Sequence, residues 1–496
     1  MSKYDPPNPI LLIDGYKLDH RRQYPPGTEY VYANWTPRAA RDPEVKEAVF
    51  FGLQYFLDRY LNDEIGGRWM YGQTHSAVAH HYKRRVDGYL GPNEIGTDHI
   101  VELHKLGYLP LDIRALPEGT LCPMGVPMLT IENTHKDFFW LPNYLETLLS
   151  NILWLPCTSA TTAYRYRKLL DTAALVTGGD PAFVSWQGHD FSYRGLCGLE
   201  AAMLSGAGHL LSFTGTDTIP ALDFIEEYYG TENAGGSVAA TEHSVMCAGG
   251  QESEIETFRR LLKLYPAGVL SVVSDTWDLW KVLTEYVPTL KQEIMARNGK
   301  LVIRPDSGDP VKIICGDRTL DYADKKNLPA ILGVVQLLWD TFGGTVTKQG
   351  YKVLDSHIGV IYGDSITLDR ADQICTGLRA RGFASTNVVF GIGSYTYQHT
   401  TRDTLGFAMK ATWAQINGVA HNLFKKPVTD SGVKFSARGR LAVLPGSHTA
   451  RPTLVQEATP DLIAQSMLEP VYLNGKVLRR QTFGEIRQRL HPARVA

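Results

Sequence analysis

The chain has 496 residues, of which 50 are Lys or Arg and 52 are Asp or Glu, giving a formal net charge of −2. Its residues are 44% hydrophobic and 21% charged, which is typical of a folded soluble protein and gives no support for a nucleic-acid or membrane-surface partner. No apolar run approaches the ~18 residues that a membrane helix needs.

The length and the cysteines indicate the number of domains and the expected cellular compartment. One hydrophobic core rarely supports so long a chain, so we expect about two to three domains. The six cysteines lack C-x-x-C spacing, which predicts neither a disulfide framework nor a thiolate zinc site. The N-terminal residues have no basic-then-apolar secretion pattern. We therefore expect a cytoplasmic protein.

The N-terminal part of the chain mixes short elements with turns. Residues 10–13 form an apolar run that predicts a strand, and residues 47–60 carry apolar side chains at helical spacing. His75, His80 and His81 have no carboxylate at a useful spacing. Their pattern favours a solvated helix face over a metal site.

Strands and helices alternate regularly from residue 158. The predicted helices are 158–172, 199–209, 219–229, 276–296 and 368–381. The predicted strands are 182–186, 210–213, 237–240, 269–273, 301–303, 358–361 and 387–390. Seven strand-to-helix steps favour a closed (β/α) barrel over an open doubly wound sheet.

The C-terminal part returns to antiparallel structure. Residues 407–413, 419–424 and 441–444 have the pattern of strands separated by turns. Within residues 471–477, Asn474 and Gly475 are typical of a two-residue hairpin turn.

Polar residues follow the predicted parallel strands at the point where each strand ends. Arg304 could bind a phosphate with two hydrogen bonds, and carboxylates suited to ribose hydroxyls or Mg²⁺ occur at Asp275, Asp306 and Asp364. Glycines that would let backbone N–H groups approach phosphate oxygens are Gly308, Gly363, Gly391 and Gly393. A single Asp or Gly here is often only a helix cap or a tight turn. Their joint placement favours a site for a polyanion that carries a sugar.

Two further segments are candidates for chemistry. Residues 189–195 combine Phe191 with Arg194, which could stack on and hydrogen-bond to a flat ring, although an Asp–Arg pair that fixes a loop explains them equally well. Asp217 adds a strand-end carboxylate. His243 follows an acidic residue and could act as base or nucleophile, but a core histidine bonded to its neighbour is the ordinary alternative. No P-loop, G-x-G-x-x-G, G-x-S-x-G or H-E-x-x-H pattern occurs.

At these residues the chain resembles the nicotinamide phosphoribosyltransferases, which are type II phosphoribosyltransferases. The matching segments extend over nearly the whole length and are 14–17, 23–26, 51–55, 117–119, 189–195, 215–218, 242–244, 271–275, 304–308, 363–364, 401–403 and 424–425. The resemblance implies a (β/α) barrel-like catalytic domain, residues 158–404, with a mixed α/β domain formed by residues 1–157 and 405–496. It also implies a homodimer with two shared active sites.

The reaction implied by the resemblance joins nicotinamide to the 5-phosphoribosyl group of phosphoribosyl pyrophosphate. The products are nicotinamide mononucleotide and pyrophosphate, in NAD salvage, with Mg²⁺ as cofactor and ATP as a co-substrate. In this family ATP phosphorylates a histidine, which His243 matches.

The resemblance assigns roles to individual residues of this sequence. The ring of nicotinamide would lie between Phe191 and the partner subunit's Tyr16, with Arg194 and Asp217 at the carboxamide. The catalytic set would be His243, Asp306, Asp275 and Arg304. The phosphoribosyl and phosphate groups would be bound by Ser271, Arg304, Asp306, Gly363, Asp364, Gly393, Arg402, Lys410 and Lys425. No direct protein ligand to a metal is assigned.

Two alternatives remain at this point. A nicotinate phosphoribosyltransferase shares the fold, but Asp217 would repel the carboxylate of nicotinate and accept from an amide NH₂. The second alternative is a non-catalytic binding or signalling protein with the same fold. The intact set of Arg304, Asp306 and His243 argues against it. Ser394 and Tyr395 stand where the family usually continues with glycines.

Overall fold

The computed structural model describes residues 7–363, 365–425, 437–446 and 451–492. The chain folds into two compact units. The first consists of Met1–Thr161, Phe224–Thr231 and Thr400–Ala496, and the second of Thr162–Asp223 and Glu232–His399. The boundary near residue 161 falls inside one long helix, α6 (Glu146–Thr177).

The second unit is built on a seven-stranded, wholly parallel sheet with the order β7-β6-β14-β13-β10-β9-β8. Its strands are β6 (Gly188–Asp190), β7 (Gly215–Thr216), β8 (Ala239–Ala240), β9 (Ala267–Val273), β10 (Asn298–Arg304), β13 (Ile358–Tyr362) and β14 (Val388–Ile392). A parallel bridge between Gly215 and Gly236 joins β7 to the segment that precedes β8. The curled sheet confirms the barrel-like fold expected from the strand count.

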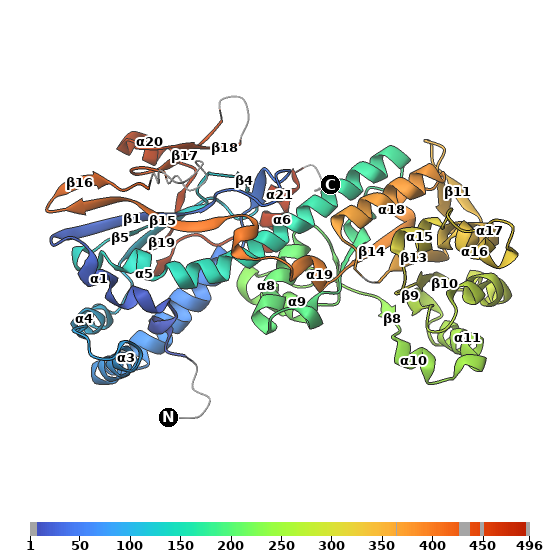
Figure 1. Ribbon diagram of the computed structural model, residues 1–496, viewed down its shortest axis with the longest axis horizontal. Helices are drawn as coiled ribbons and strands as arrows, with labels where there is room; N and C mark the ends of the chain where they lie inside the picture. Colours follow the sequence, from blue (N-terminus) through green and yellow to red (C-terminus); the bar gives the residue numbers. More distant parts are fainter. Residues whose placement is uncertain (1–6, 364, 426–436, 447–450, 493–496) are drawn as a thin grey trace. The chain divides into compact units, whose positions relative to one another are not determined.

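Helices cover this sheet as the alternation predicts. Figure 1 shows them around the central strands: α8 (Leu199–Leu210), α11 (Glu254–Leu264), α15 (Pro310–Cys315), α17 (Val334–Phe342) and α18 (Leu368–Ala380). The central strands carry Leu301, Ile303, Ile358 and Val360, which are all at most 1% exposed. Continuous apolar strands of this kind are typical of a parallel sheet that is covered by helices. Because the strands are parallel, their C-terminal ends lie at one edge.

Two predicted strands of the second unit are wrong. Residues 182–186 form a turn and the short helix α7 (Val184–Gln187), and the strand follows at β6. The Asp180 carboxylate accepts a hydrogen bond from the backbone N–H of Ala182 and favours this turn. Residues 210–213 end helix α8 and turn, so the strand is β7, two residues later.

The long helix predicted at residues 276–296 is broken into pieces. Asp278 caps the first turn, and the pieces are α12 (Leu279–Lys281), the π-helical segment Val282–Tyr286, α13 (Val287–Thr289) and α14 (Lys291–Met295). Pro288 lies in the middle of the run and cannot donate a helical hydrogen bond. The remaining helix predictions at 199–209, 219–229 and 368–381 are confirmed, the second as α9 (Ile219–Tyr229).

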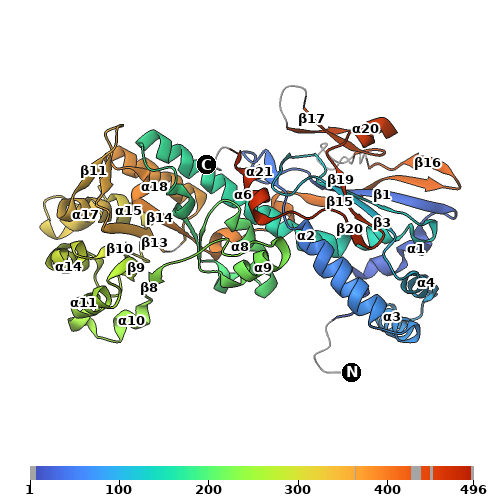
Figure 2. The same cartoon turned by 180° about the vertical axis from the view of Figure 1, so that it is seen from behind.

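The first unit contains an antiparallel sheet with strands from both ends of the chain. Its order is β16-β15-β1-β5-β3-β19-β20. The strands are β1 (Thr28–Pro37), β3 (Leu111–Ala115), β5 (Leu129–Asn133), β15 (Phe407–Ile416), β16 (Val419–Asn422), β19 (Glu469–Leu473) and β20 (Lys476–Val477). Figure 2 shows β3, β19 and β20 from behind. Asn474 and Gly475 have φ of 48° and 84°, as the predicted two-residue hairpin requires.

Two predictions at the start of the chain are wrong. Residues 10–13 fall at a 3₁₀ turn, Pro9–Leu11, which the Asn8 side chain caps. Residues 47–60 begin as strand β2 (Glu47–Val49), which pairs with β4 (Leu121–Pro123), and become helical only at Leu53. Helical spacing of apolar residues is ambiguous over so short a run.

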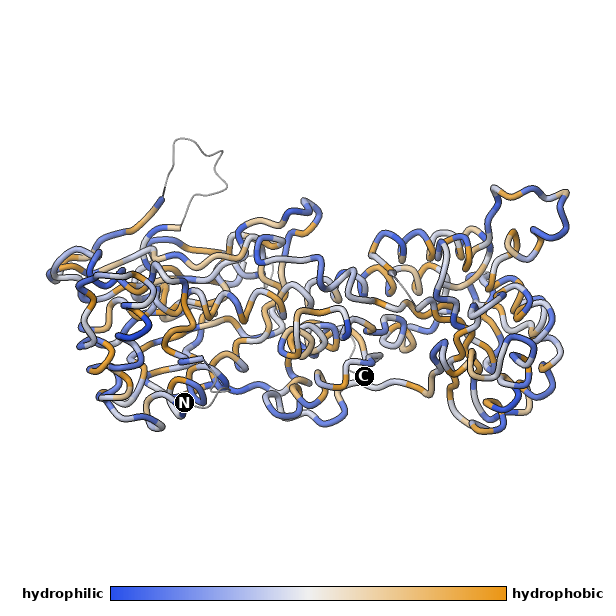
Figure 3. Tube along the Cα trace, turned by 60° about the horizontal axis from the view of Figure 1, so that its bottom comes forward, coloured by the Kyte–Doolittle hydropathy of each residue, from blue (hydrophilic) through white to orange (hydrophobic). Residues whose placement is uncertain are grey.

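Each unit has its own apolar interior. In Figure 3 hydrophobic stretches follow the inner strands and helices, whereas many peripheral turns are hydrophilic. Across the described parts of the chain, no helix combines the length and apolar character required to span a membrane. His75, His80 and His81 all lie on one helix, α3 (His75–Leu90), of which His75 is the first residue.

His99, on α4 (Asp98–Leu106), makes the first unit sensitive to acid. Burial lowers its pKa to about 3, and the nearby charge of Arg21 acts in the same direction. The folded state therefore binds this proton more weakly than the unfolded chain does. Stability is complete above the ordinary pKa of 6.5 and is lost as the pH falls from there toward 3.

When the pH falls from 7.5 to 4.5, the free energy of unfolding should decrease less in His99→Phe than in the unmodified protein. We expect the two decreases to differ by about 2–3 kcal/mol. Thermal unfolding at the two pH values measures this difference. His80→Phe is the control, because His80 lies exposed on α3. An equal acid-induced loss in His99→Phe and the unmodified protein would show that His99 is not responsible.

Candidate functional site

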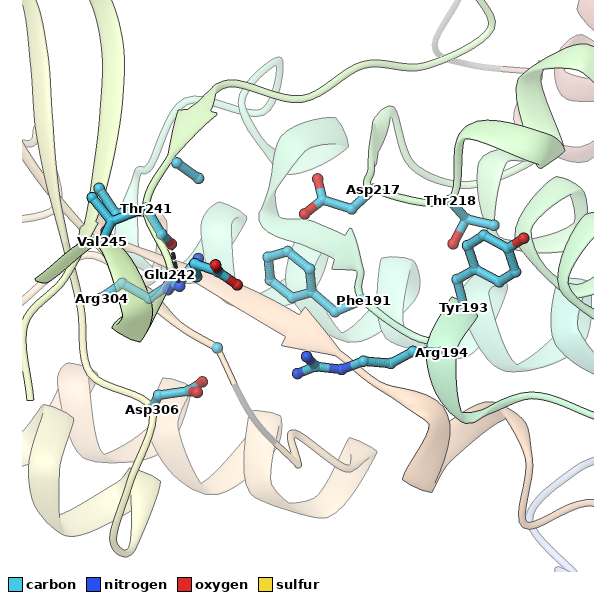
Figure 4. Close-up of a pocket in the computed structure, with 12 residues that line it drawn as sticks. Phe191, Tyr193, Arg194, Asp217, Thr218, Thr241, Glu242, Val245, Arg304 and Asp306 are labelled. Carbon is cyan, nitrogen blue, oxygen red and sulfur yellow. Dashed lines mark hydrogen bonds between the residues drawn. The ribbon is translucent and has the colours of Figure 1, made fainter. Parts of the chain in front are cut away.

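A pocket of about 480 Å³ lies in the second unit, at the C-terminal ends of the parallel strands. Figure 4 shows the Phe191 ring near its centre, with Asp217 and Arg194 on either side and with Arg304 and Asp306 across from them. The lining residues are Phe191, Tyr193, Arg194, Asp217, Thr218, Ala240, Thr241, Glu242, Val245, Arg304, Asp306 and Gly363. The structure thus brings together groups from five segments that are far apart in the sequence.

Arg304 ends strand β10 and is held by the neighbouring chain. Its Nη2 donates to the carbonyl oxygen of Thr241 at 2.6 Å, whereas its buried Nε has no hydrogen-bond partner among the described residues. Burial lowers the pKa of Arg304, and three carboxylates, Asp306, Asp217 and Asp275, act in the opposite direction. An arginine remains charged under these conditions and can bind an anion through its remaining N–H groups.

Asp275 organises the loop that follows β10. Its Oδ2 accepts from the backbone N–H groups of Asp306 and Ser307, both at 2.7 Å, and from the Ser307 hydroxyl at 2.6 Å. Its Oδ1 is buried and makes no hydrogen bond to the described residues. Asp275 therefore holds the Asp306 loop with one oxygen and has the other oxygen available.

Gly363 follows strand β13 and lies against Asp306. A Cβ at this position would come within 2.4 Å of Asp306 Oδ1, so a side chain would displace that carboxylate. Gly391 is also restricted, since a Cβ there would lie 2.9 Å from the Phe191 ring. A Cβ at Gly393 would meet nothing within 4 Å, so packing within the chain does not explain that glycine. Asp364 lies outside the described residues.

The other side of the pocket carries Phe191, Arg194 and Asp217. The backbone N–H of Phe191 donates to Ile392 in β14, which places the ring beside the sheet edge. Arg194 lies in the exposed 3₁₀ turn Tyr193–Gly195. Asp217 Oδ1 is bound by His189 Nε2 at 2.9 Å and by the Ser237 hydroxyl at 2.6 Å. An aromatic face with an acceptor and a donor nearby suits a flat heterocycle that bears an amide.

His243 begins α10 (His243–Cys247) and is half exposed. Its Nε2 lies 3.8 Å from Asp306 Oδ2, and its Nδ1 is 3.1 Å from the Thr276 hydroxyl. The ordinary alternative, a core histidine bonded to Glu242, is therefore wrong. An exposed imidazole beside a carboxylate is accessible to a reactant.

A second cavity of about 370 Å³ extends into the interior of the curled sheet. It shares Phe191, Asp217 and Arg304 with the first pocket and also contains Ser271, whose buried hydroxyl has no hydrogen-bond partner among the described residues. Ser271 therefore lines this second cavity and not the first pocket.

Four predicted residues, Tyr16, Arg402, Lys410 and Lys425, belong to the first unit. Three of them lie in one electrostatic neighbourhood with Lys17 and Glu146. Lys17 forms an ion pair with Glu146, and Lys410 Nζ lies 3.9 Å from the same carboxyl group. Burial lowers the pKa of Lys410, as do the charges of Arg38, Lys17 and Arg402. The charge of Arg402 also acts on the pKa of Tyr16, which burial raises.

The sequence did not reveal several residues that hold the site. Thr241 fixes Arg304 through a carbonyl group that any residue would offer. In the first unit, and not among the residues that line this pocket, the paired residues Lys17 and Glu146 are 129 positions apart, and no spacing rule connects them. His189 lay within a segment already singled out, but its bond to Asp217 depends on the pairing of β6 with β7.

Two sequence families match the chain. The nicotinate phosphoribosyltransferase (NAPRTase) family matches residues 186–476, and the N-terminal domain of nicotinamide phosphoribosyltransferase matches residues 8–113. The first match alone covers more than half of the 496 residues.

Curated relatives agree with these matches. The chain is 53% identical to a nicotinamide phosphoribosyltransferase of Acinetobacter baylyi, with 97% of each chain covered. It is 36% identical to a nicotinamide phosphoribosyltransferase of Xanthomonas campestris pv. campestris, covering 98% of this chain and 99% of the relative.

Solved structures show the same fold at low identity. A nicotinate-nucleotide pyrophosphorylase from Pyrococcus furiosus has a TM-score of 0.57 at 13% identity, covering 99% of this chain and 96% of that one. Human nicotinic acid phosphoribosyltransferase has a TM-score of 0.53 at 15% identity, covering 97% and 93%. With relatives of this identity and coverage, the chain belongs to the nicotinate phosphoribosyltransferase family, on its nicotinamide phosphoribosyltransferase branch.

Proposed function

We propose that the protein transfers the 5-phosphoribosyl group of phosphoribosyl pyrophosphate to nicotinamide, as a pentosyltransferase of NAD biosynthesis. The observation that carries this proposal is the pocket in which Asp217 and Phe191 lie opposite Arg304 and Asp306. One half suits an aromatic amide and the other half suits a phosphorylated sugar. The relatives with full-length similarity bear this activity in their names.

The reaction forms one bond and breaks one. The ring nitrogen of nicotinamide attacks the anomeric carbon of the ribose while the bond from that carbon to pyrophosphate breaks. Positive charge develops on the ribose, so the carboxylate of Asp306 stabilises the transition state if it faces that carbon. The cationic ring of the product needs no proton transfer, and pyrophosphate leaves with the electron pair.

Mg²⁺ is proposed as the cofactor. It would neutralise the leaving pyrophosphate and orient it. Among the residues that the structure describes, no three His, Cys, Asp or Glu side chains form a metal cluster. Mg²⁺ commonly binds through one or two carboxylates and the phosphates of its substrate, and Asp306 and the free Oδ1 of Asp275 fit that pattern.

ATP is proposed to stimulate synthesis by phosphorylating His243. The γ-phosphoryl group would move to an imidazole nitrogen, ADP would leave, and water would later release phosphate. The exposure of His243 and its place beside Asp306 support this role. The added oxygens would bring negative charge and hydrogen-bond acceptors toward the ribose and Mg²⁺.

We expect His243→Ala to keep basal synthesis and to lose the stimulation by ATP. Initial rates with and without ATP measure this, alongside ADP release and acid-labile labelling from γ-labelled ATP. His357→Leu is the control, since His357 pairs with Asp355 and does not line the pocket. Undiminished ATP stimulation in His243→Ala would exclude the phosphohistidine.

A homodimer is proposed to complete the site. The basic neighbourhood of Lys17, Lys410 and Arg402 in the first unit suits the phosphates of a substrate, and Tyr16 is 60% exposed. In the proposed dimer these groups and Lys425 serve the pocket of the other copy, and light scattering measures its mass. We also infer a cytoplasmic location, which fits six cysteines that are all free and which fractionation tests.

The experiment that tests the function follows mononucleotide formation from phosphoribosyl pyrophosphate with nicotinamide or nicotinate, each with and without ATP. Turnover of nicotinamide in preference to nicotinate is the expected result. Turnover of nicotinate alone would assign the sister activity. No turnover of either base would support a binding protein on this scaffold.

A further inference from the structure

Asp217 is held on one side only. Both hydrogen bonds that it accepts, from His189 Nε2 and from the Ser237 hydroxyl, end on Oδ1. No hydrogen bond from the described residues reaches Oδ2, and the side chain is 43% exposed toward the pocket. The carboxylate therefore has one oxygen fixed by the protein and the other free for a ligand.

His189 is placed by the sheet. It lies in β6 between β14 and β7, opposite Gly391 and Gly215, and is 8% exposed. A Cβ at Gly215 would come within 2.7 Å of His189 Nδ1, so the glycine makes room for the ring. With Nδ1 against the backbone of β7, Nε2 is the nitrogen directed at Asp217.

Ser237 is placed by the bridge that connects the two edges of the sheet. Gly236 pairs with Gly215, and the next residue is Ser237. Its hydroxyl must donate to Asp217, because a carboxylate has no proton to give. The two donors thus come from β6 and from the segment that precedes β8, and they converge on one oxygen.

We propose that His189 and Ser237 are positioning residues that set the choice between nicotinamide and nicotinate. This inference rests on the proposed function, in which Asp217 selects the base. Two donors on Oδ1 fix the carboxylate rotamer so that Oδ2 accepts from the amide NH₂. They also favour the ionised form, and indeed the pKa of Asp217 is lowered by these bonds despite its burial. A protonated Asp217 would instead donate, and would accommodate the carboxylate of nicotinate.

The test compares kcat/KM for nicotinamide and for nicotinate in the full-length protein. We expect His189→Leu to lower the ratio of the two values about tenfold, chiefly by raising KM for nicotinamide, because a charge-assisted hydrogen bond is lost. His189→Gln can offer an amide N–H close to the position of Nε2 and should keep the ratio within about threefold of the original. Ser237→Ala should lower the ratio by a smaller factor.

A purely structural role of His189 would not produce this difference, since Leu and Gln both replace the ring. His357→Leu is the matched control, because it breaks another His–Asp hydrogen bond, of 2.7 Å, in the same unit. Equal ratios in the Leu and Gln variants would overturn the inference while leaving the proposed function intact. An unmodified protein that does not prefer nicotinamide would overturn both.

Discussion

Asp306→Asn is expected to lower kcat by roughly a hundred- to a thousandfold, with KM values little changed. The amide has the shape of the carboxylate but lacks its charge, which in the proposed reaction faces the developing positive charge on the ribose. The backbone N–H that anchors residue 306 to Asp275 is unaffected by the change. Steady-state rates with phosphoribosyl pyrophosphate and nicotinamide, each varied in turn, measure both constants.

Asp309→Asn is the control for this experiment. Asp309 follows in the same loop and caps α15 by accepting from Val311 and Lys312, a role in which Asn serves equally well. Its variant should have normal kcat. If Asp306→Asn also kept normal kcat, the charge of Asp306 would have no part in the chemistry.

Asp217→Asn is expected to shift the ratio of kcat/KM for nicotinamide over nicotinate by roughly a hundredfold. The substitution removes the negative charge that is proposed to repel nicotinate, and it supplies an NH₂ group that can donate to the carboxylate of nicotinate. The amide oxygen can still accept from His189 and Ser237, so the NH₂ group faces the pocket. Parallel assays with the two bases measure the shift.

Asp223→Asn provides the matched control, because Asp223 is an exposed carboxylate on α9, the helix that follows β7, and does not line the pocket. Its ratio should equal that of the unmodified protein. A ratio in Asp217→Asn that also stays unchanged would show that another group selects the base, and the role inferred for His189 would fail with it.

The long central strands of the second unit could be predicted, whereas the short strands β6 and β7 could not. β9, β10 and β13 are apolar runs that stop at polar residues, and a run of that kind is a local property. β6 and β7 have only three and two residues, whereas β8 lies within the predicted run 237–240. Such short strands form because a neighbouring strand offers hydrogen bonds. The apolar runs at 182–186 and 210–213 have a stronger strand pattern, so the strands were predicted there instead.

The candidate site shows the same limit. Arg304, Asp306, Asp217 and Phe191 were found from the sequence, and the structure brings them into one pocket. Their individual roles remain predictions that came from the resemblance. The partners that orient them, such as Thr241 for Arg304 and His189 for Asp217, depend on which strands are neighbours, and no local pattern specifies that.

The sheet of the first unit has a consequence for synthesis on the ribosome. One edge of β1 pairs with β15, in a register that joins Pro37 to Phe407. At ~5–20 residues per second, translation needs roughly 20–75 s to reach β15 after β1 has emerged. Throughout that interval β1 has an open edge, which is a template for aggregation, and the whole second unit, which ends at His399, is synthesised before β15 appears. The nascent chain should therefore depend on chaperones until its last hundred residues appear.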